Sequence, residues 1–407
     1  MKRIFGLIAA VSTCALAAAS LASCKVGSGE KFGFIFLHDS KSTYDNNFIE
    51  AAKKACNDLG VQAVLKTNIP EGEECYAAAK DLVAMGCKGV FADSFGHEDF
   101  LIKAAKDYKD VQFAHATGTK AHTEKLDNFQ NAFANIYEGR YIAGVAAGLK
   151  LNDMMAKDST VTPLMGYVGA FPYAEVVSGY TAFFLGAKSV CPTVQMKVRY
   201  TNSWYDENAE KSTCETLINK DNCVLISQHA DSQGAPGVCE AKKVPNVFYN
   251  GENKELSNSY LTASRINWVP FFKYFIENTL KGNDMSYDWV GTLANGAVEY
   301  YAPNEKIAAE GTAAKLNEVK AKLQAGTLHV FDTTTFTVSK FGDGTNTFFN
   351  LNAKVDADGR VTSYKADVDS DEAYQGDTEV VDGNIFKESV YRSAPYFDLR
   401  IDGITEL

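Results

Sequence analysis

The segment most clearly equipped for chemistry is the box Leu-Ala-Ser-Cys at positions 21–24, which ends in a thiol. Lys2 and Arg3 precede it, followed by an apolar run over Ile4–Ala19. This order is typical of an export signal with a small-residue cleavage site. In bacterial lipoproteins the cysteine of such a box is acylated and becomes the new N-terminus, and we predict this for Cys24. The alternative is an ordinary signal peptide in which Cys24 is incidental.

The predicted signal also indicates a location. Its apolar run is shorter than the ~20 residues of a membrane-spanning helix. We therefore expect residues 1–23 to be a cleaved signal peptide and 24–30 to be a tether that carries acyl chains such as palmitate on Cys24. The protein would be anchored by lipid to a bacterial membrane in the cell envelope, with its body outside the cytoplasm.

Composition limits the classes of protein to consider. Removing residues 1–23 from the 407 leaves 384, more than one ordinary core accommodates, so two lobes are expected. Hydrophobic residues make up 46% of the chain and charged residues 22%, as in folded globular proteins. The net charge of −11 becomes −13 without Lys2 and Arg3. This acidic balance argues against nucleic acid as a partner.

The chain has nine cysteines, of which Cys14 lies in the signal and Cys24 at the lipid site. The remaining seven form no C-x-x-C pair, which argues against zinc-ribbon and thioredoxin-type sites. Because seven is odd, at least one thiol stays unpaired within the chain, and we expect most to be small buried hydrophobic residues. Disulfides among four of them stay open: Cys191, Cys214, Cys223 and Cys239.

After the tether, apolar strand-like runs alternate with helix-like segments. Strands are expected at Phe32–Leu37, Ala63–Lys66, Gly89–Ala92 and Val111–His115, with helices at about Asn46–Leu59, Glu73–Met85 and Glu98–Asp107. A second series has strands at Leu164–Gly169, Val194–Tyr200, Cys223–Ser227 and Val247–Tyr249, with helices at about Tyr141–Leu151, Ala174–Ala187, Asn208–Asn219 and Pro236–Lys242. Alternation of this kind predicts an α/β fold of two doubly wound parallel-sheet units, joined by a polar and aromatic crossover at Asn128–Asn135.

Ligands of such sheets bind beyond the carboxyl ends of the strands. The residues at these positions combine hydrogen-bonding side chains with flat aromatic rings. The candidate ligand-binding residues are Tyr44, Asp45, Asn47, Ser94, Phe95, His97, Phe171, Trp204, Asp206, His229, Asp231 and Asn250. The alternative for any one of them is a turn former or a helix cap, as Asp45 and Asp206 could be.

Motifs for most catalytic and cofactor chemistry are missing. The sequence has no phosphate loop, no dinucleotide fingerprint, no G-x-S-x-G elbow and no H-E-x-x-H pair. Histidines at the strand ends (His38, His97, His115 and His229) lack the paired spacing of metal ligands, so we expect hydrogen bonding and no metal or cofactor. A hydrolase-type carboxylate pair stays open.

The aromatic and acidic candidates suit one kind of ligand. Tyr44, Phe95, Phe171 or Trp204 could stack on a planar base. Asp45 or Asp206 could accept hydrogen bonds from sugar hydroxyls or ring N–H groups. A flat heterocycle that carries a polyol is a nucleoside. The alternative is that the rings only fill the cleft wall.

The C-terminal segment from about Asp332 has a different composition, rich in Thr, Asp, Gly and aromatic residues that alternate with period two. Asp356–Gly359 predicts a hairpin turn. Asp367, Asp369 and Asp371 have the spacing that begins a calcium loop, but Glu372 stands where the turn glycine is needed. We therefore expect a solvated acidic loop there.

Several stretches between Phe32 and Val330 resemble the basic membrane protein family of bacterial lipoproteins, which is related to the purine nucleoside receptor of spirochaetes. They are S-T-Y-D-N-N-F (42–48), D-S-F-G-H-E (93–98), H-A-T-G-T (115–119), Y-E-G-R-Y-I-A-G-V-A-A-G (137–148), G-Y-V-G-A-F-P (166–172), S-W-Y-D (203–206) and Q-H-A-D-S (228–232). The resemblance implies a periplasmic-binding protein type I fold and a substrate-binding role in an ABC importer. It also implies that Tyr44 and Trp204 flank the base, with Asp45 or Asp206 on the ribose or base edge.

These observations together predict a non-enzymatic, monomeric receptor that holds a purine nucleoside or nucleobase between two lobes for an ABC permease. The first lobe would be 31–136 plus 267–330, the second 137–266, and 331–407 a β-rich extension packed on the body. Two alternatives stay open: a nucleoside hydrolase that uses the same carboxylates, and a surface adhesin or antigen on the same scaffold.

Overall fold

The computed structural model describes residues 29–341, 350–368 and 378–407. The predicted signal peptide and Cys24 lie outside these residues, and so do Asp369, Asp371 and Glu372 of the acidic loop. Among the residues described, no helix combines the length and apolar character needed to cross a membrane.

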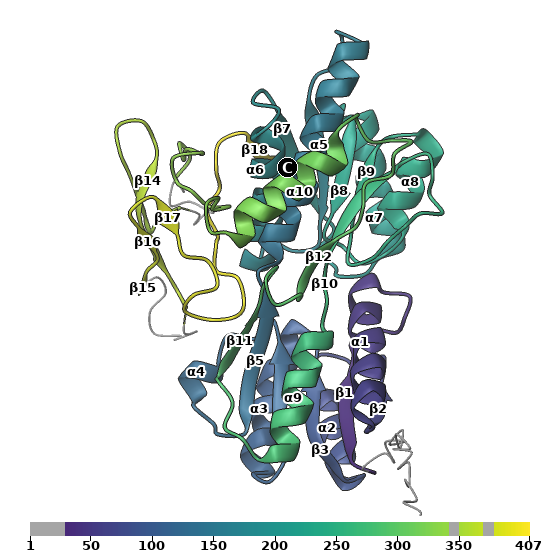
Figure 1. Ribbon diagram of the computed structural model, residues 1–407, viewed down its shortest axis with the longest axis vertical. Coiled ribbons are helices and arrows are strands. Elements are labelled where there is room, and N and C mark those ends of the chain that lie inside the picture. Colours follow the sequence, from purple (N-terminus) through teal and green to yellow (C-terminus); the bar gives the residue numbers. More distant parts are fainter. Residues whose placement is uncertain (1–28, 342–349, 369–377) are drawn as a thin grey trace, which may run out of the picture.

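The first sheet has six parallel strands in the order β11-β5-β4-β3-β1-β2. These strands are β1 (Lys31–Ile35), β2 (Gln62–Lys66), β3 (Cys87–Ala92), β4 (Gln112–Ala116), β5 (Phe129–Ala134) and β11 (Asp288–Gly291). The helices are α1 (Thr43–Leu59), α2 (Glu73–Ala84), the 3-10 turn η1 (Phe95–His97), α3 (Glu98–Asp107), α4 (Ala121–Glu124) and α9 (Val269–Lys281). Helices α1 and α9 pack together, as do α2 and α3, so two helix layers enclose a buried sheet (Figure 1).

The second sheet has seven strands in the order β12-β10-β9-β8-β6-β7-β18, and only β12 is antiparallel. These are β6 (Leu164–Gly169), β7 (Gln195–Tyr200), β8 (Leu225–Gln228), β9 (Asn246–Tyr249), β10 (Tyr260–Ile266), β12 (Val298–Tyr300) and β18 (Ile404–Glu406). The helices are α5 (Ile136–Lys157), α6 (Ala174–Lys188), α7 (Glu207–Asn219), α8 (Gly234–Lys242) and α10 (Thr312–Gln324). The expected pair of doubly wound parallel-sheet units is therefore confirmed.

The predicted crossover at Asn128–Asn135 is wrong, because residues 129–134 form the fully buried strand β5. The amide nitrogens of its polar side chains have partners inside the protein: the Asn131 Nδ2 donates to the Glu98 Oε1 over 3.1 Å, and the Gln130 Nε2 contacts the Met285 sulfur at 3.1 Å. Polar residues with buried partners are compatible with a central strand, so composition alone misled the prediction.

The chain passes between the two sheets three times, from β5 to α5, from β10 to α9 and from β11 to β12. The boundaries predicted after residues 136 and 266 lie at the first two passages. The third passage divides 267–330, because α9 and β11 belong with the first sheet, whereas β12 pairs with β10 and α10 packs on α5. We therefore propose a division in which β12 and α10 belong to the second lobe.

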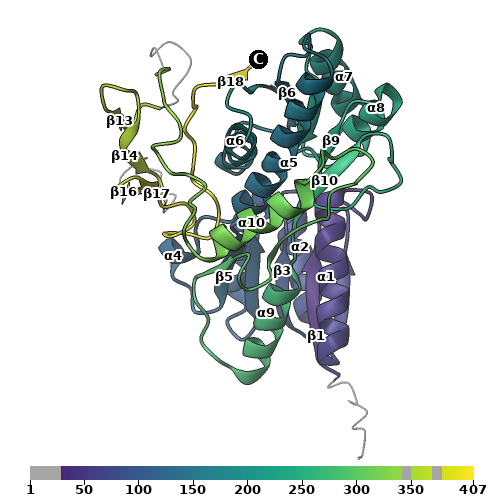
Figure 2. The same ribbon diagram turned by 45° about the horizontal axis from the view of Figure 1, so that its top comes forward.

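The described residues of the C-terminal extension (331–341, 350–368 and 378–407) lie beside both lobes (Figure 2). They contain two small sheets, β13 (Ala353–Val355) with β14 (Val361–Ala366) and β15 (Thr378–Glu379), and β16 (Val381–Asp382) with β17 (Ile385–Phe386). The predicted turn at Asp356–Gly359 joins the antiparallel strands β13 and β14. Strand β18 then adds to the edge of the second sheet, parallel to β7.

The seven cysteines of the body are all buried and all unpaired in the structure. They occupy core positions, as expected for small hydrophobic residues. The sulfurs of Cys214 and Cys239 lie 3.7 Å apart between α7 and α8.

Helices α5 and α6 are in direct backbone contact. A Cβ atom added to Gly144 would lie 2.0 Å from the Phe183 carbonyl oxygen, and one added to Gly186 would lie 2.0 Å from the Tyr141 carbonyl oxygen. Only glycine allows two helices to approach so closely.

We therefore expect Gly186→Ala to lower the free energy of unfolding by about 3 kcal/mol, because the methyl group must push α5 away from α6. Gly237→Ala is the matched control, since that glycine lies in α8 with no atom near its added Cβ. The control should gain roughly 0.5–1 kcal/mol from helix propensity. Urea unfolding of both variants measures the difference, and equal stabilities would contradict the close contact.

Candidate functional site

The carboxyl ends of the two sheets face each other across a small cavity, which we call the inner cleft. The first lobe lines it with Leu37, His38, Tyr44, Asp45, Ser94, Phe95 and Thr117, and the second with Glu175, Trp204, His229 and Asp231. Its volume of about 20 Å³ is room for one water molecule. Seven of the twelve predicted site residues are brought together here.

The small volume reflects direct contact between the lobes. The Thr43 backbone N–H donates to the Asp231 carbonyl oxygen over 3.0 Å, and the Thr43 hydroxyl donates to the same oxygen over 3.3 Å. Ring contacts also cross the cleft, from His38 to Tyr205 and from Phe95 to Tyr173. The structure is thus a closed form.

Asp45 is a buried carboxylate whose partners are protein groups. Its oxygens accept from the His38 backbone N–H over 2.7 Å and from the Ser42 hydroxyl over 2.5 Å, and the His38 Nδ1 lies 3.3 Å away. Burial raises the pKa of this carboxyl, but the hydrogen bonds from His38 and Ser42 outweigh burial and hold the pKa below its usual value. Asp45 therefore supplies a fixed negative charge that also orders the start of α1.

Asp93 and Asp231 differ from Asp45, because their carboxyl pKa values are raised and not lowered. They are only 0% and 4% exposed, and burial, followed by the nearby Asp45 carboxylate, raises the pKa of both well above the usual value. One oxygen of Asp93 has no hydrogen-bond partner. A carboxylic acid that keeps its proton can both donate and accept. Asp231 lines the inner cleft, so its carboxyl group can meet a donor or an acceptor of a ligand, whereas Asp93 does not line the cavity.

His229 is held by two residues that sequence reasoning missed. The Arg140 Nη2 lies 3.2 Å from the His229 Nδ1, and a guanidinium can only donate, so the Nδ1 must accept. The Nε2 then carries the proton and lies 3.4 Å from a Glu175 oxygen. Burial lowers the pKa of His229, consistent with a neutral ring. The sequence did contain a signal for this contact: Arg140 lies in the largely apolar segment Y-E-G-R-Y-I-A-G-V, and a charged residue in such a segment is expected to be buried against a polar partner.

Aromatic rings gather on one side of the inner cleft. Phe171 and Tyr173 stack with ring centroids 5.1 Å apart, and Trp204 meets Phe171 edge to face at 5.2 Å. Phe95 of the first lobe stacks on Tyr173 at 5.6 Å. These rings form a continuous apolar surface that spans both lobes and suits a planar ligand.

Five predicted site residues lie outside the inner cleft. Asn47 donates to the Ile266 carbonyl oxygen, and the buried His97 ring contacts the Ile69 carbonyl oxygen at 2.9 Å, with its pKa lowered by burial to about 4. Phe171 supports Trp204, and Asp206 caps α7 by accepting from the backbone N–H groups of Asn208 and Ala209. Asn250 is buried with its side-chain oxygen unpaired.

The part of the chain that the structure describes holds no group of three or more His, Cys, Asp or Glu side chains placed to bind a metal ion. The side chains that line the inner cleft offer aromatic faces, hydrogen-bonding groups and charge.

Comparisons with known proteins give the family. Residues 36–330 match the family model Bmp, described as ABC transporter substrate-binding protein PnrA-like. A purine-binding protein of Brucella abortus is 32% identical over 313 residues, which is 74% of this chain and 83% of that protein. A protein of Haloferax volcanii described as a candidate glucose-binding protein of an ABC transporter is 31% identical over 53% of this chain, and the match spans about half (52%) of that protein.

Solved structures agree on the fold. A solute-binding protein of an ABC transporter from Conexibacter woesei superposes with a TM-score of 0.60 at 17% identity, covering 74% of this chain and 98% of that one. One from Aeropyrum pernix gives 0.61 at 13% identity, covering 73% and 92%. The chain belongs to the Bmp family of extracytoplasmic ABC transporter substrate-binding proteins, and both the expected family and the two-lobed type I fold are confirmed.

The raised pKa of Asp231 predicts that the free energy of unfolding depends on pH. Because the folded pKa lies above the unfolded value of 3.8, the protonated form stabilises the fold fully below pH 3.8, and this contribution is lost as the pH rises through the folded value. Asp231→Asn keeps the backbone bond to Thr43 and removes the ionisable group. We expect its free energy of unfolding at pH 7 to exceed that of the native chain by about 1–3 kcal/mol.

Denaturant unfolding at neutral pH and below pH 3.8 measures this effect, and the difference should disappear in the acidic series. The exposed Asp284→Asn serves as control and should change little at either pH. A less stable Asp231→Asn at pH 7 would show that the ionised carboxylate stabilises the closed form.

Proposed function

We propose that this substrate-binding protein captures a purine nucleoside or free purine base between its lobes and presents it to a membrane permease for uptake. The observation that carries the proposal is the inner cleft itself, where an aromatic surface from both lobes adjoins buried carboxyl groups. Members of this family work with ABC transporters as solute-binding proteins and not as enzymes.

The chemistry of the inner cleft matches the two parts of a nucleoside. The face of Trp204 or Tyr44 can stack on a base, as planar heterocycles stack on aromatic side chains. The carboxyl groups of Asp45 and Asp231, which line the inner cleft, can accept hydrogen bonds from ring N–H, amino and hydroxyl groups. The purine-binding relative in Brucella abortus supports a purine as the base.

The negative charge of the site favours an uncharged ligand. Glu175 and Asp45 surround the cavity, and the buried Arg140 is already engaged with the Gln228 carbonyl oxygen and with His229. A phosphorylated nucleotide would be repelled by these carboxylates at short range. We therefore propose the nucleoside or base, and not the nucleotide, as the transported form.

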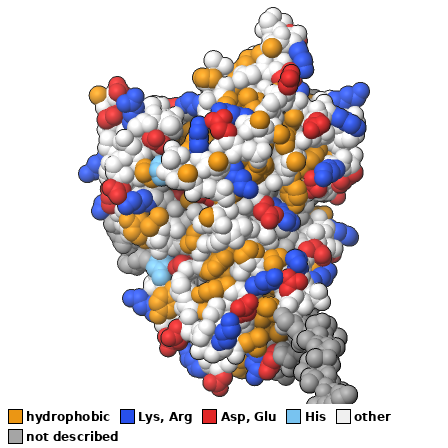
Figure 3. All heavy atoms as spheres, in the orientation of Figure 1, with side chains coloured by type: hydrophobic (Ala, Val, Ile, Leu, Met, Phe, Trp, Pro, Cys, Tyr) orange, Lys and Arg blue, Asp and Glu red, His pale blue; other side chains and the backbone are white. Residues whose placement is uncertain are grey.

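Capture requires the lobes to open, because the closed inner cleft has room for about one water molecule. A hinge at the three passages between the sheets would open it, as in other two-lobed binding proteins. We also propose that Cys24 anchors the protein beside its permease through lipid. Figure 3 shows acidic and basic side chains interspersed over the face it displays, which gives no support to a nucleic-acid surface.

Calorimetry with inosine, adenosine, guanosine and their bases tests the ligand on residues 25–407. We expect at least one to bind, and Trp204→Ala to weaken it by about 1–3 kcal/mol through lost stacking. Trp204→Phe keeps a ring and should lose less. Binding that Trp204→Ala leaves unchanged would remove this side chain from the site.

The same samples separate binding from hydrolysis. Incubation with inosine followed by chromatography should return inosine without free hypoxanthine. Release of the base would favour the hydrolase alternative, and failure of every purine to bind would contradict the proposed ligand and leave the adhesin or antigen alternative.

A further inference from the structure

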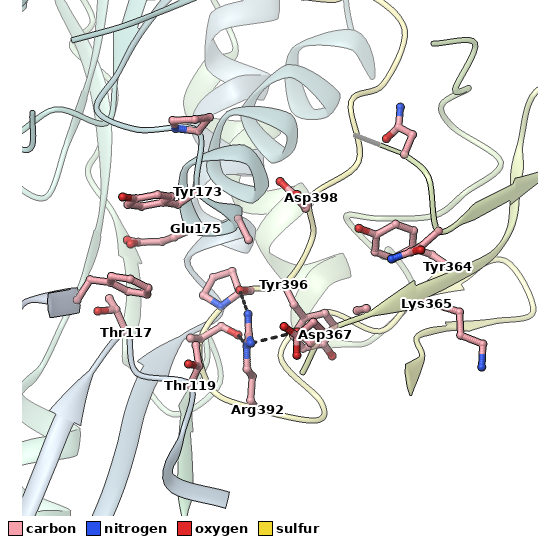
Figure 4. Close-up of a pocket in the computed structure, with 18 of the residues that line it drawn as sticks. Thr117, Thr119, Tyr173, Glu175, Tyr364, Lys365, Asp367, Arg392, Tyr396 and Asp398 are labelled. Atoms are coloured by element: carbon pink, nitrogen blue, oxygen red, sulfur yellow. Dashed lines mark hydrogen bonds between the residues drawn. The ribbon is translucent and has the colours of Figure 1, made fainter. Parts of the chain in front are cut away.

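A second cavity, which we call the vestibule, adjoins the inner cleft on the side of the C-terminal extension (Figure 4). Its volume is about 660 Å³, within the range of small-molecule sites. The two lobes line it at the mouth of the cleft, and more than half of its lining residues come from the extension, within 350–352, 364–367 and 392–398. These residues lie beyond the segment 36–330 that matches the family.

The two cavities share a wall. Phe95, Thr117, Glu175 and Trp204 line both the inner cleft and the vestibule. Figure 4 shows Thr117, Tyr173 and Glu175 grouped on the side of the vestibule opposite Tyr364. A ligand in the inner cleft can therefore extend past these shared residues into the larger space.

The extension forms a fixed wall. The buried Arg392 guanidinium donates to the carbonyl oxygens of Asp367, Ala394 and Pro395 over 2.9–3.1 Å, which ties the residue that follows β14 to the segment before β18 (Figure 4). Ser393 donates to an Asp288 oxygen of the first lobe through both its N–H and its hydroxyl, each over 2.7 Å. The wall is thus built from defined contacts, as a binding surface requires.

The groups that line the vestibule select against an anionic ligand. Arg392 directs its N–H groups at three carbonyl oxygens, and Asp398 is paired with Arg400. What the wall offers is aromatic surface, including the 44% exposed ring of Tyr173, together with the carboxylate of Glu175. The exposed Lys365 also lines the vestibule, and its side chain extends away from Tyr173 and Glu175 (Figure 4). Aromatic faces beside carboxylates and amides suit a neutral group that has C–H faces and many hydroxyl donors.

We propose that the vestibule is a sugar subsite, which receives the sugar end of the ligand and has room for a further uncharged, hydroxyl-rich group attached to it. This rests on the proposed function in one respect, that the inner cleft holds the base. The sugar that occupies the vestibule could be joined to the base or be a free sugar, and the experiment below distinguishes these two ligands.

The test fills the vestibule without disturbing the core. Asn352 is exposed and lines the vestibule, so Asn352→Trp should occupy part of it. Asn352 lies directly before β13, and Thr362→Trp is the matched control, because Thr362 is an exposed residue of the neighbouring strand β14 that does not line the cavity. The probes for calorimetry are hypoxanthine, inosine, inosine glucosylated at its 5′ oxygen, inosine 5′-monophosphate, and free ribose and glucose.

We expect the native chain to bind glucosylated inosine about as tightly as inosine, and the monophosphate about tenfold or more weakly. Asn352→Trp should weaken glucosylated inosine by about tenfold or more and leave hypoxanthine unchanged, while Thr362→Trp should change neither. Binding of free ribose or glucose that Asn352→Trp abolishes also supports the subsite, with a free sugar as its occupant.

Three outcomes would overturn the proposal. In the first, inosine binds and its glucosylated form does not. In the second, Asn352→Trp affects all nucleosides and hypoxanthine equally. In either case the purine function stands without the subsite. In the third, neither a purine nor a sugar binds, and both proposals fail together.

Discussion

The contact between α5 and α6 is the constraint on which the candidate site depends. Gly144 and Gly186 bring the two helix backbones together at a separation that no Cβ atom would permit. Helix α5 carries Arg140 and α6 carries Glu175, and these side chains meet His229 on its two ring nitrogens. The tautomer of His229 and the position of the Glu175 carboxylate therefore follow from how closely two helices can pack.

The carboxyl groups of the inner cleft impose a second constraint, which concerns the ligand. Asp45 remains ionised because protein hydrogen bonds compensate for its burial, whereas burial raises the pKa of Asp231 and also that of Asp93, which does not line the cleft. Closing the lobes removes water from the two carboxyl groups that line the cleft, Asp45 and Asp231, which costs free energy unless a ligand supplies hydrogen bonds. A neutral ligand rich in N–H and O–H donors meets that requirement, and a phosphate does not.

Much of this arrangement could be predicted from the sequence because apolar runs and helix signals are local. The strand Leu164–Gly169 and the helix Glu98–Asp107 have the predicted bounds. Strand β5 could not be predicted in this way, since its polar residues are explained only by partners distant in the chain. The strand-end rule likewise found the loop residues of the inner cleft, but Arg140 lies within a helix and reaches the site only through tertiary packing.

The C-terminal extension links the two lobes, and this connects it to the cleft mechanically. Ser393 is bonded to Asp288 at the start of β11 in the first sheet. Strand β18 pairs with β7 of the second sheet, and its Glu406 accepts from the hydroxyls of Tyr180 and Tyr200 over 2.6 Å. Separation of the sheets must lengthen one of these attachments. The pair of hydrogen bonds to one Asp288 oxygen is the smaller attachment, so opening of the cleft should release the extension from the first lobe while it remains joined to the second.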